Sequence, residues 1–267
     1  MMTDTDPEKE PRGVQAVETG FALLRLIAGA GTLGVADLRA GSGLGRAQVH
    51  AYLASFLDAG LVEKDPASGL YRIGATGLAL GMAQLLRQDP QQIAVEEAEH
   101  TARATGQTIA IAVWGRYGPT VTASLQANDR VRNAARPGTV YSVTGTATGL
   151  LFAALLPEDA TAPVIAAQRA EATPHRYTGR CTTLAQVRPQ IELARQHDLA
   201  ATYSWPMAGI SALAAPVRNF SDQLEMALTL IGGDAEIDTD PDGPHARALR
   251  ALAARVSARL GHVPSRG

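Results

Sequence analysis

Residues 46–73 read RAQVHAYLASFLDAGLVEKDPASGLYRI, and within them the hydrophobic pattern changes from a helical period to a strand period. The first part predicts a helix over residues 46–59, and Gly60 stands where a left-handed residue commonly ends a helix. Residues 61–64 and 70–73 then predict two strands, joined by the strong turn sequence DPASG. The side chains that we expect on the buried side of the helix are Val49, Leu53, Phe56 and Leu57.

Two further helices are predicted before this stretch, over residues 14–28 and 35–40. The apolar stripe of the first consists of Val14, Val17, Phe21, Leu24 and Ala28, widened by Leu23, Leu26 and Ile27. Three helices followed by a hairpin within about sixty residues is the order of a winged helix-turn-helix. We therefore expect that fold over residues 13–74.

The rest of the chain predicts an α+β domain. Helices are expected at residues 91–105, 146–156, 158–170, 184–197 and 245–260, and strands at 108–114, 119–126, 139–143, 200–204, 210–217 and 224–231. Because the two types do not alternate strictly and several strands are hairpin-close, a mostly antiparallel sheet is favoured. The expected organisation is a disordered tail (1–12), the winged domain, a linker helix (75–89), this α+β domain (90–262) and a short tail (263–267).

Composition limits the classes of protein that fit. The chain has 267 residues, a formal net charge of −2 and a single cysteine, Cys181, which excludes a disulfide framework. No signal peptide or transmembrane run is recognisable, so we expect a soluble cytoplasmic protein without a membrane partner. Between residues 12 and 74, six basic residues stand against five acidic ones. Such a module should bind DNA weakly without sequence specificity, and usefully only as a dimer.

The sequence contains only weak matches to motifs that are typical of enzymes. Residues 29–34, GAGTLG, match G-x-G-x-x-G, but the preceding segment has helical periodicity and no acidic residue lies near position 49. The six histidines show no metal-ligand spacing, and Cys181 has no evident catalytic partner. We expect neither a metal nor a cofactor and no enzymatic activity. The alternatives are a small-molecule enzyme built on the C-terminal α+β region, and a scaffold that dimerises without specific DNA.

The helix over residues 46–59 divides its surface as a DNA-recognition helix requires. Arg46, Ala47 and His50 are expected to point outward, with Gln48 on the flank. Arginine can pair with guanine and glutamine with adenine in the major groove, and a small side chain allows close approach. The expected phosphate contacts come from Lys64 and Arg72 on the hairpin and from Arg12 in the N-terminal arm, which could also enter a minor groove.

The chain resembles the IclR family of bacterial transcriptional regulators along nearly its whole length. The resemblance is carried by GVQAVETGFALLRLIAGAG (13–31), residues 35–81, ATGQTIAIAVW (104–114), TATGLLFAALLP (146–157), RYTGR (176–180) and GISALAAPV (209–217). It implies a winged helix-turn-helix, a linker helix and a GAF-like C-terminal domain that binds a small molecule. Such regulators form dimers or dimers of dimers and repress or activate catabolic operons, with small organic acids or aromatic compounds as effectors.

The same resemblance suggests where an effector would bind. By alignment the site consists of Ala147, Thr148, Gly149, Thr202, Ala212, Thr229 and Ile231, with Trp114 and Tyr141 as an aromatic wall. Leu150 replaces the family's lysine, Thr202 an acidic residue and Ala212 a cysteine, so the site is less polar than one for a short oxoacid. We expect an effector that is larger or aromatic, such as an aromatic carboxylate held by backbone N–H groups from Thr146 to Gly149. The alternative is that these apolar residues are simply core.

Overall fold

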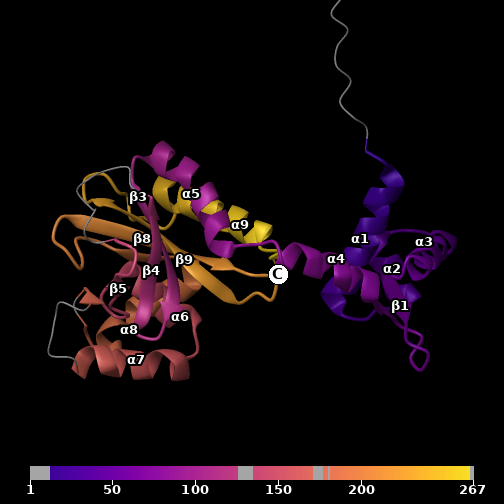
Figure 1. Ribbon diagram of the computed structural model, residues 1–267, viewed down its shortest axis with the longest axis horizontal. Coiled ribbons are helices and arrows are strands. Elements are labelled where there is room, and N and C mark those ends of the chain that lie inside the picture. Colours follow the sequence, from indigo (N-terminus) through magenta and orange to yellow (C-terminus); the bar gives the residue numbers. More distant parts are fainter. Residues whose placement is uncertain (1–12, 126–134, 171–176, 180, 265–267) are drawn as a thin grey trace, which may run out of the picture. The chain divides into compact units, whose positions relative to one another are not determined.

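The computed structural model describes residues 13–125, 135–170, 177–179 and 181–264. The chain divides into two compact units, Met1–Gln88 and Asp89–Gly267 (Figure 1). The tail expected at residues 1–12, with the predicted DNA contact Arg12, lies outside the described residues. None of the described helices is long and apolar enough to cross a membrane.

The first unit has the predicted order of elements. It contains α1 (Gln15–Ala30), α2 (Val35–Ser42), α3 (Arg46–Asp58), β1 (Val62–Lys64), β2 (Tyr71–Ile73) and α4 (Ala75–Leu85). Its core consists of Leu23, Ile27, Leu38, Val49, Leu53, Val62 and Tyr71. Gly60 has φ +66°, as its sequence position indicated, so the chain can turn directly from α3 into the antiparallel β1–β2 hairpin. The winged helix-turn-helix is confirmed.

The buried face predicted for α1 is wrong in part. Leu23 and Ile27, which widened the predicted stripe, are buried together with Gly20, whereas Val14, Val17 and Phe21 are more than half exposed. A Cβ at Gly20 would lie 3.2 Å from the ring of Phe56, so the absence of a side chain lets α3 approach this face. The helix is apolar on both sides, and sequence periodicity alone could not choose between them. Leu57 of α3, predicted to be buried, is also exposed.

The second unit contains α5 (Pro90–Thr105), β3 (Thr108–Gly115), β4 (Gly118–Leu125), β5 (Val140–Tyr141), α6 (Ala147–Leu155), α7 (Glu158–Ala170), β6 (Tyr177–Thr178), α8 (Leu184–His197), β7 (Ala200–Thr202), β8 (Ile210–Arg218), β9 (Leu224–Gly233) and α9 (Pro244–Arg259). In the described residues its sheet has the order β6-β5-β4-β3-β9-β8-β7. All neighbouring pairs are antiparallel except β5 and β6. The predicted α+β class with a mostly antiparallel sheet is confirmed.

Helices cover both faces of this sheet (Figure 1). Helices α5 and α9 pack on one face over a core of large aliphatic side chains, among them Ile109, Leu213 and Leu228. Helices α6 and α8 pack on the other face, where the strands contribute mostly alanines. Two parts of the sheet differ from the prediction. The strand expected at 139–143 is limited to β5, because the N–H of Val143 turns to the side chain of Gln168, and the short strand β6 was not predicted.

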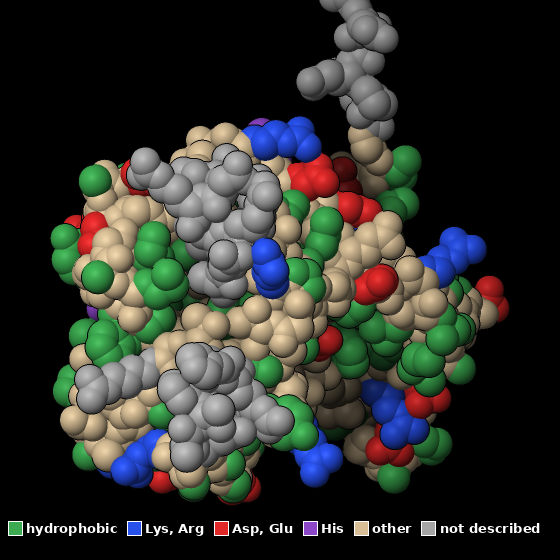
Figure 2. Space-filling model, turned by 60° about the vertical axis from the view of Figure 1, so that its left-hand side comes forward, with side chains coloured by type: hydrophobic (Ala, Val, Ile, Leu, Met, Phe, Trp, Pro, Cys, Tyr) green, Lys and Arg blue, Asp and Glu red, His purple; other side chains and the backbone are tan. Residues whose placement is uncertain are grey.

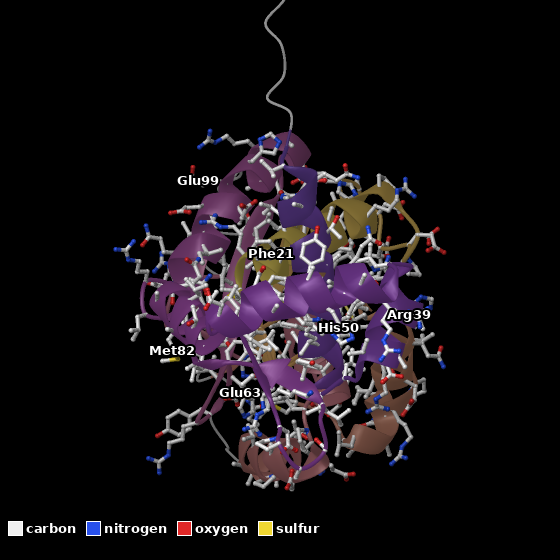
Figure 3. All side chains as sticks on the ribbon, turned by 90° about the vertical axis from the view of Figure 1, so that its right-hand side faces the viewer. Phe21, Arg39, His50, Glu63, Met82 and Glu99 are labelled. Carbon is white, nitrogen blue, oxygen red and sulfur yellow. The ribbon has the colours of Figure 1, made fainter. Side chains whose placement is uncertain are left out.

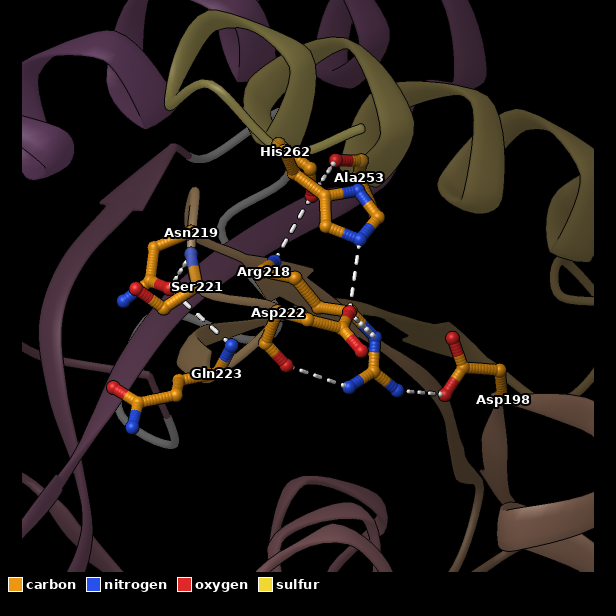
Figure 4. A network of polar contacts seen from close by, with 9 residues as sticks. Asp198, Arg218, Asn219, Ser221, Asp222, Gln223, Ala253 and His262 are labelled. Carbon is orange, nitrogen blue, oxygen red and sulfur yellow. Dashed lines mark hydrogen bonds and ion pairs between the residues drawn. The ribbon is translucent and has the colours of Figure 1, made fainter. Parts of the chain in front are cut away.

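A polar network fastens the β8–β9 turn to the end of α9 (Figure 4). The guanidinium of Arg218 donates to Asp198 at 2.9 Å, and its backbone N–H donates to the Ser257 hydroxyl at 3.0 Å. The His262 ring lies 2.9 Å from the Asp222 carboxylate in the turn. The network therefore ties the β8–β9 turn to the end of α8 and to α9 with the residues that follow it.

Charges are mixed on the surface. On the face shown in Figure 2, Lys and Arg side chains are interspersed with Asp and Glu, and no broad area carries a single sign. Several of these charges form pairs: Glu97 of α5 accepts from Arg255 and Arg259 of α9 at 3.1 and 3.2 Å. The hydrogen bond from Arg255 is the main cause that lowers the pKa of Glu97 below its ordinary value of 4.5.

We expect Glu97→Gln to reduce the free energy of unfolding by about 1 kcal/mol at pH 7, because the variant cannot carry the charge that both arginines face. A lowered pKa stabilises the fold above the ordinary pKa and loses this effect as pH falls through the folded value. The difference between variant and wild type should therefore shrink from pH 5 to pH 3 in thermal melts. Glu99→Gln, which removes a single exposed pair with Arg103, is the control and should have little effect. A pH-independent difference would contradict the assignment.

Candidate functional site

The N-terminal half of α3 presents the predicted reading residues. Arg46, Ala47, Gln48 and His50 are exposed, whereas Val49 faces the core. Figure 3 looks onto this unit and labels Phe21, Arg39 and His50, which come from α1, α2 and α3. The Gln48 side-chain carbonyl accepts a hydrogen bond from the N–H of Gly45 at 3.0 Å and so caps the start of its own helix. No hydrogen bond or ion pair with another described residue engages the side chains of Arg46 and His50, whereas Gln48 has this one.

Both cations of the hairpin contact a neighbouring side chain. Arg72 forms an ion pair with Glu63 across the two strands, with both side chains at least half exposed. The ammonium of Lys64 lies 5.5 Å from the centre of the Tyr71 ring. Because the ion pair is exposed, water already weakens it, and a phosphate could replace the Glu63 carboxylate.

A cavity of about 40 Å³ opens in the second unit, at the start of α6 and over the sheet. It is lined by Tyr141, Thr146, Ala147, Thr148, Thr178, Thr202, Trp205, Pro206, Met207, Ile210, Ala212, Thr229 and Ile231. Most of the predicted effector residues are thus brought together. The strand pairing explains the convergence, because Thr202 lies opposite Ala212, which in turn lies opposite Ile231, on one face of the sheet.

Two predicted effector residues do not line this cavity. Trp114 lies near the far end of β3, and its ring packs against Phe152 of α6 with 5.5 Å between centres, so it is part of the core. Gly149 has a structural role: its N–H donates to the Thr146 hydroxyl, and a Cβ there would lie 2.2 Å from the carbonyl oxygen of Ser142. Only glycine lets α6 begin so close to the chain that follows β5.

Sequence reasoning missed Thr178 of β6 and part of the segment between β7 and β8. Trp205, Pro206 and Met207 line the cavity from this segment, followed by Ile210. Hydrogen bonds hold the segment: Ser204 donates its N–H to the Ser211 hydroxyl, and Ser211 donates to Asp234 at 2.6 Å. That second bond is the main cause of the lowered pKa of Asp234. The sequence signal that could have pointed to this segment is its Trp-Pro pair, which places a large aromatic side chain between two strands.

The lining is uncharged, and the surface that it presents to the cavity is almost entirely apolar. None of the described residues that line the cavity is ionic, and many carry a hydroxyl. Thr148 and Thr229 share a hydrogen bond at 2.7 Å, whereas the Tyr141 hydroxyl and Thr202 Oγ1 are buried with no partner in the described chain. Burial raises the pKa of Tyr141 well above its ordinary value, so its phenol stays protonated. The backbone N–H groups of Ala147 and Thr148, at the start of α6, also have no acceptor among the described residues.

The three sequence features that could indicate an enzyme are not supported by the described residues. Residues 29–34 lie at the end of α1 and just after it, so the strand required before a dinucleotide-binding loop is a helix. The described residues hold no group of three histidine, cysteine, aspartate or glutamate side chains that could bind a metal. Cys181 is half-buried and accepts a hydrogen bond from Ser142 at 3.3 Å. The cavity is therefore suited to binding a molecule by hydrogen bonds and apolar contact.

Comparison with known proteins agrees with both units. The model of the IclR helix-turn-helix domain matches residues 16–66, and that of the C-terminal domain of the bacterial transcriptional regulator IclR matches residues 82–258. The glycerol operon regulatory protein of Streptomyces griseus is 31% identical over 257 residues, which cover 94% of this chain and 98% of the relative.

Solved structures show the same architecture. The crystal structure of HmgR from Pseudomonas aeruginosa superposes with a TM-score of 0.76 at 28% identity, covering 93% of this chain and 99% of that one. The Agobacterium tumefaciens repressor BlcR superposes with a TM-score of 0.72 at 18% identity, covering 94% and 99%, a likeness in fold alone. With both domains matched and a relative above 30% identity along almost the whole chain, the protein belongs to the IclR family of bacterial transcriptional regulators.

Proposed function

We propose that this chain is a ligand-responsive regulator of a catabolic operon, in which α3 reads operator DNA and the cavity at the start of α6 binds the effector. The observation that carries the proposal is the uncharged cavity with its unpaired buried hydroxyls, in a chain whose other unit is a winged helix-turn-helix. The S. griseus relative's name, a glycerol operon regulator, supports a catabolic target. The proposed site of action is the cytoplasm, and α4 is the proposed linker between reader and sensor.

In the proposed complex α3 lies in the major groove of the operator. Arg46 would pair with a guanine, while Ala47 keeps the helix close to the base edges and His50 and Gln48 contact bases or phosphates beside it. Lys64 and Arg72 would contact phosphates from the hairpin, and Arg12 would reach the DNA from the N-terminal arm. The exposed ion pair of Arg72 with Glu63 has to open for this contact.

The effector is proposed to be a small organic acid, with aromatic acids as the first candidates. No cation lines the cavity in the described residues, so the carboxylate would be held by the N–H groups of Ala147 and Thr148, where the helix dipole of α6 favours an anion. Trp205 and Ile210 offer apolar surface to the rest of such a molecule. Effector binding would bias the populations of two arrangements of the DNA-reading units.

A homodimer, or a dimer of dimers, is the proposed assembly. In the first unit, α1 exposes Val14, Val17 and Phe21, and α4 exposes Leu78, Leu80, Met82, Leu85 and Leu86. Helix α4 has no buried residue. An apolar helix surface of this kind is expected to be covered, and a second copy of the same unit would cover it while presenting a second α3 to the next major groove.

We expect Arg46→Ala to weaken operator binding by about 1–3 kcal/mol, roughly 5- to 150-fold, if Arg46 reads a base. Electrophoretic mobility shift with the DNA upstream of the gene, set against a scrambled fragment, measures this. Arg103→Ala, which removes an exposed arginine on α5, is the matched control and should bind like wild type. An equal loss on both fragments would mean that Arg46 contacts a phosphate, and no loss would contradict the α3 assignment.

Phe21→Glu should shift the chain from dimer towards monomer at micromolar concentration, because it places a charge on the exposed apolar face of α1. Analytical ultracentrifugation of the full chain measures the mass. Phe220→Glu, an exposed phenylalanine in the turn between β8 and β9, is the matched control and should leave the assembly unchanged. An unchanged mass for Phe21→Glu would show that α1 is not at the interface.

A further inference from the structure

We propose that the Trp205 indole is the gate of the α6 cavity, and that it rotates aside to admit a ligand from a second, larger hollow. This inference rests on the proposed function of the cavity and describes how a ligand reaches it. The second space, here called the outer hollow, has a volume of about 400 Å³. Among the described residues it is lined by Arg169, Cys181, Thr182, Thr183, Gln186 and Trp205. Of these, Trp205 alone also lines the cavity, so its side chain lies between the two spaces.

With Trp205 in its present position, the cavity is too small for an aromatic ligand. One water molecule needs about 10–15 Å³ of such a space, and an apolar cavity that takes up benzene measures about 150 Å³. The volume of about 40 Å³ therefore holds about three waters. A ligand with an aromatic ring can enter only if part of the lining moves.

The walls that α6 and the sheet contribute are held on several sides. Thr229 lies on the central strand β9, where it pairs with Ala110 on one side and Ala214 on the other. Its hydroxyl also bonds to that of Thr148 in the first turn of α6, at 2.7 Å. Moving these residues would break strand pairing or helix packing, so the movable part of the lining belongs to the segment between β7 and β8.

The indole of Trp205 has no such restraints. Its backbone N–H donates to the carbonyl oxygen of Ile210 at 3.1 Å, but its indole N–H forms no hydrogen bond with the part of the chain that the structure describes. No aromatic ring of a described residue packs against it, whereas the ring of Trp114 packs against Phe152 with 5.5 Å between centres. Trp205 is also only half-buried. Rotation about its side-chain bonds can therefore open the wall.

The segment that carries Trp205 is fastened at both ends. At one end the N–H of Ser204 donates to the Ser211 hydroxyl, and the Ser204 hydroxyl accepts from the N–H of Gly209 at 2.9 Å. At the other end the carbonyl oxygen of Gly209 accepts from the N–H of Asp234 at 3.1 Å. Because these bonds hold the backbone, the indole can rotate while the segment stays folded.

The outer hollow supplies a charge that the cavity lacks. Arg169, near the end of α7, is exposed and forms no ion pair with the part of the chain that the structure describes. A cationic group at the entrance of a site raises the local concentration of anions and their rate of association. Since no ionic side chain of the described residues lines the cavity, the hollow attracts an acid and Trp205 controls its further passage.

The rates at which an aromatic probe binds and leaves the full chain test the gate. The probes are 4-fluorobenzoate and the neutral 4-fluorophenol, whose fluorine line shapes give both rate constants. Removing a contact changes mainly the dissociation rate, whereas removing a gate speeds entry and exit together. We expect Trp205→Ala to raise both rates by about 10-fold and to change the dissociation constant less. Tyr203→Ala, which truncates an exposed ring that lines neither space, is the matched control and should keep the wild-type rates.

Arg169→Gln tests whether the path runs through the outer hollow. It should slow the association of 4-fluorobenzoate and leave that of 4-fluorophenol unchanged, because only the acid is attracted by the guanidinium. Equal rates for the acid in wild type and variant would overturn the proposed path. An association rate that Trp205→Ala leaves unchanged would show that Trp205 is a fixed wall, and the absence of binding of either probe to the wild type would also overturn the proposal.

A second measurement leaves Trp205 in place and does not depend on the folding of its variants. The full chain is labelled with 5-fluorotryptophan, and because the sequence has two tryptophans, Trp114→Phe assigns both fluorine signals. Saturation with benzoate or phenol should shift the Trp205 signal and leave that of Trp114 in place. A Trp205 signal that stays unchanged at saturation would place the indole outside the path of the ligand and overturn the proposal.

The outcomes separate the gate from the proposed function. If an acid changes operator affinity but binds at the same rates to wild type and Trp205→Ala, the gate is wrong and the regulatory function stands. If Trp205 controls the entry of the probes but no acid alters operator affinity, the gate stands and the acid effector is wrong. The Arg46→Ala experiment decides DNA reading in either case.

Discussion

The alternation of large and small side chains along β3, β8 and β9 is the constraint on which the second unit depends. On the face under α5 and α9 these strands place Ile109, Ile111, Leu213, Leu228 and Leu230, and on the face under α6 they place Ala110, Ala212, Ala214 and Ala227. Because successive side chains of a strand point to opposite faces, this alternation produces a thick aliphatic layer on one face of the sheet and a shallow layer on the other. The shallow layer lets α6 lie close to the sheet, and Gly149 lets the start of α6 lie close to the chain that follows β5.

The cavity is a consequence of the same alternation. The cavity lies over Thr202, Ala212 and Ile231, and Ala147 and Thr148 in the first turn of α6 line it as well. The segment that carries Trp205 supplies a further wall. Because the sheet face carries mainly alanine and threonine, the described residues that line the cavity are uncharged. Ligand chemistry and strand packing therefore depend on the same residues.

The parts of the fold that local sequence determines were predictable. The hairpin follows from Gly60 and the DPASG turn, and α6 follows from its continuous apolar run closed by Pro157, because each signal acts within a few residues. The buried face of α1 was predicted only in part because both sides of the helix are apolar, and the choice between them depends on Phe56 packing against Gly20. Alignment with the family placed most of the cavity residues, since they sit on strands with fixed register. It also included Trp114, which packs against Phe152 outside the cavity, and it did not include Trp205, whose position depends on how its segment folds back.

In the first unit, the residues proposed to recognise bases differ from the cations that would attract the DNA phosphates. The wing's cations already have contacts within the domain, Arg72 with Glu63 and Lys64 with the Tyr71 ring, so they add little unbalanced field to attract a phosphate backbone. Gln48 similarly uses its carbonyl to start α3. A single unit built this way would bind DNA poorly, so in the proposed complex discrimination depends on Arg46 and on two copies held at a fixed spacing. If DNA affinity depends on the spacing of the two copies rather than on net charge, a ligand bound in an uncharged cavity could control DNA binding by changing that spacing.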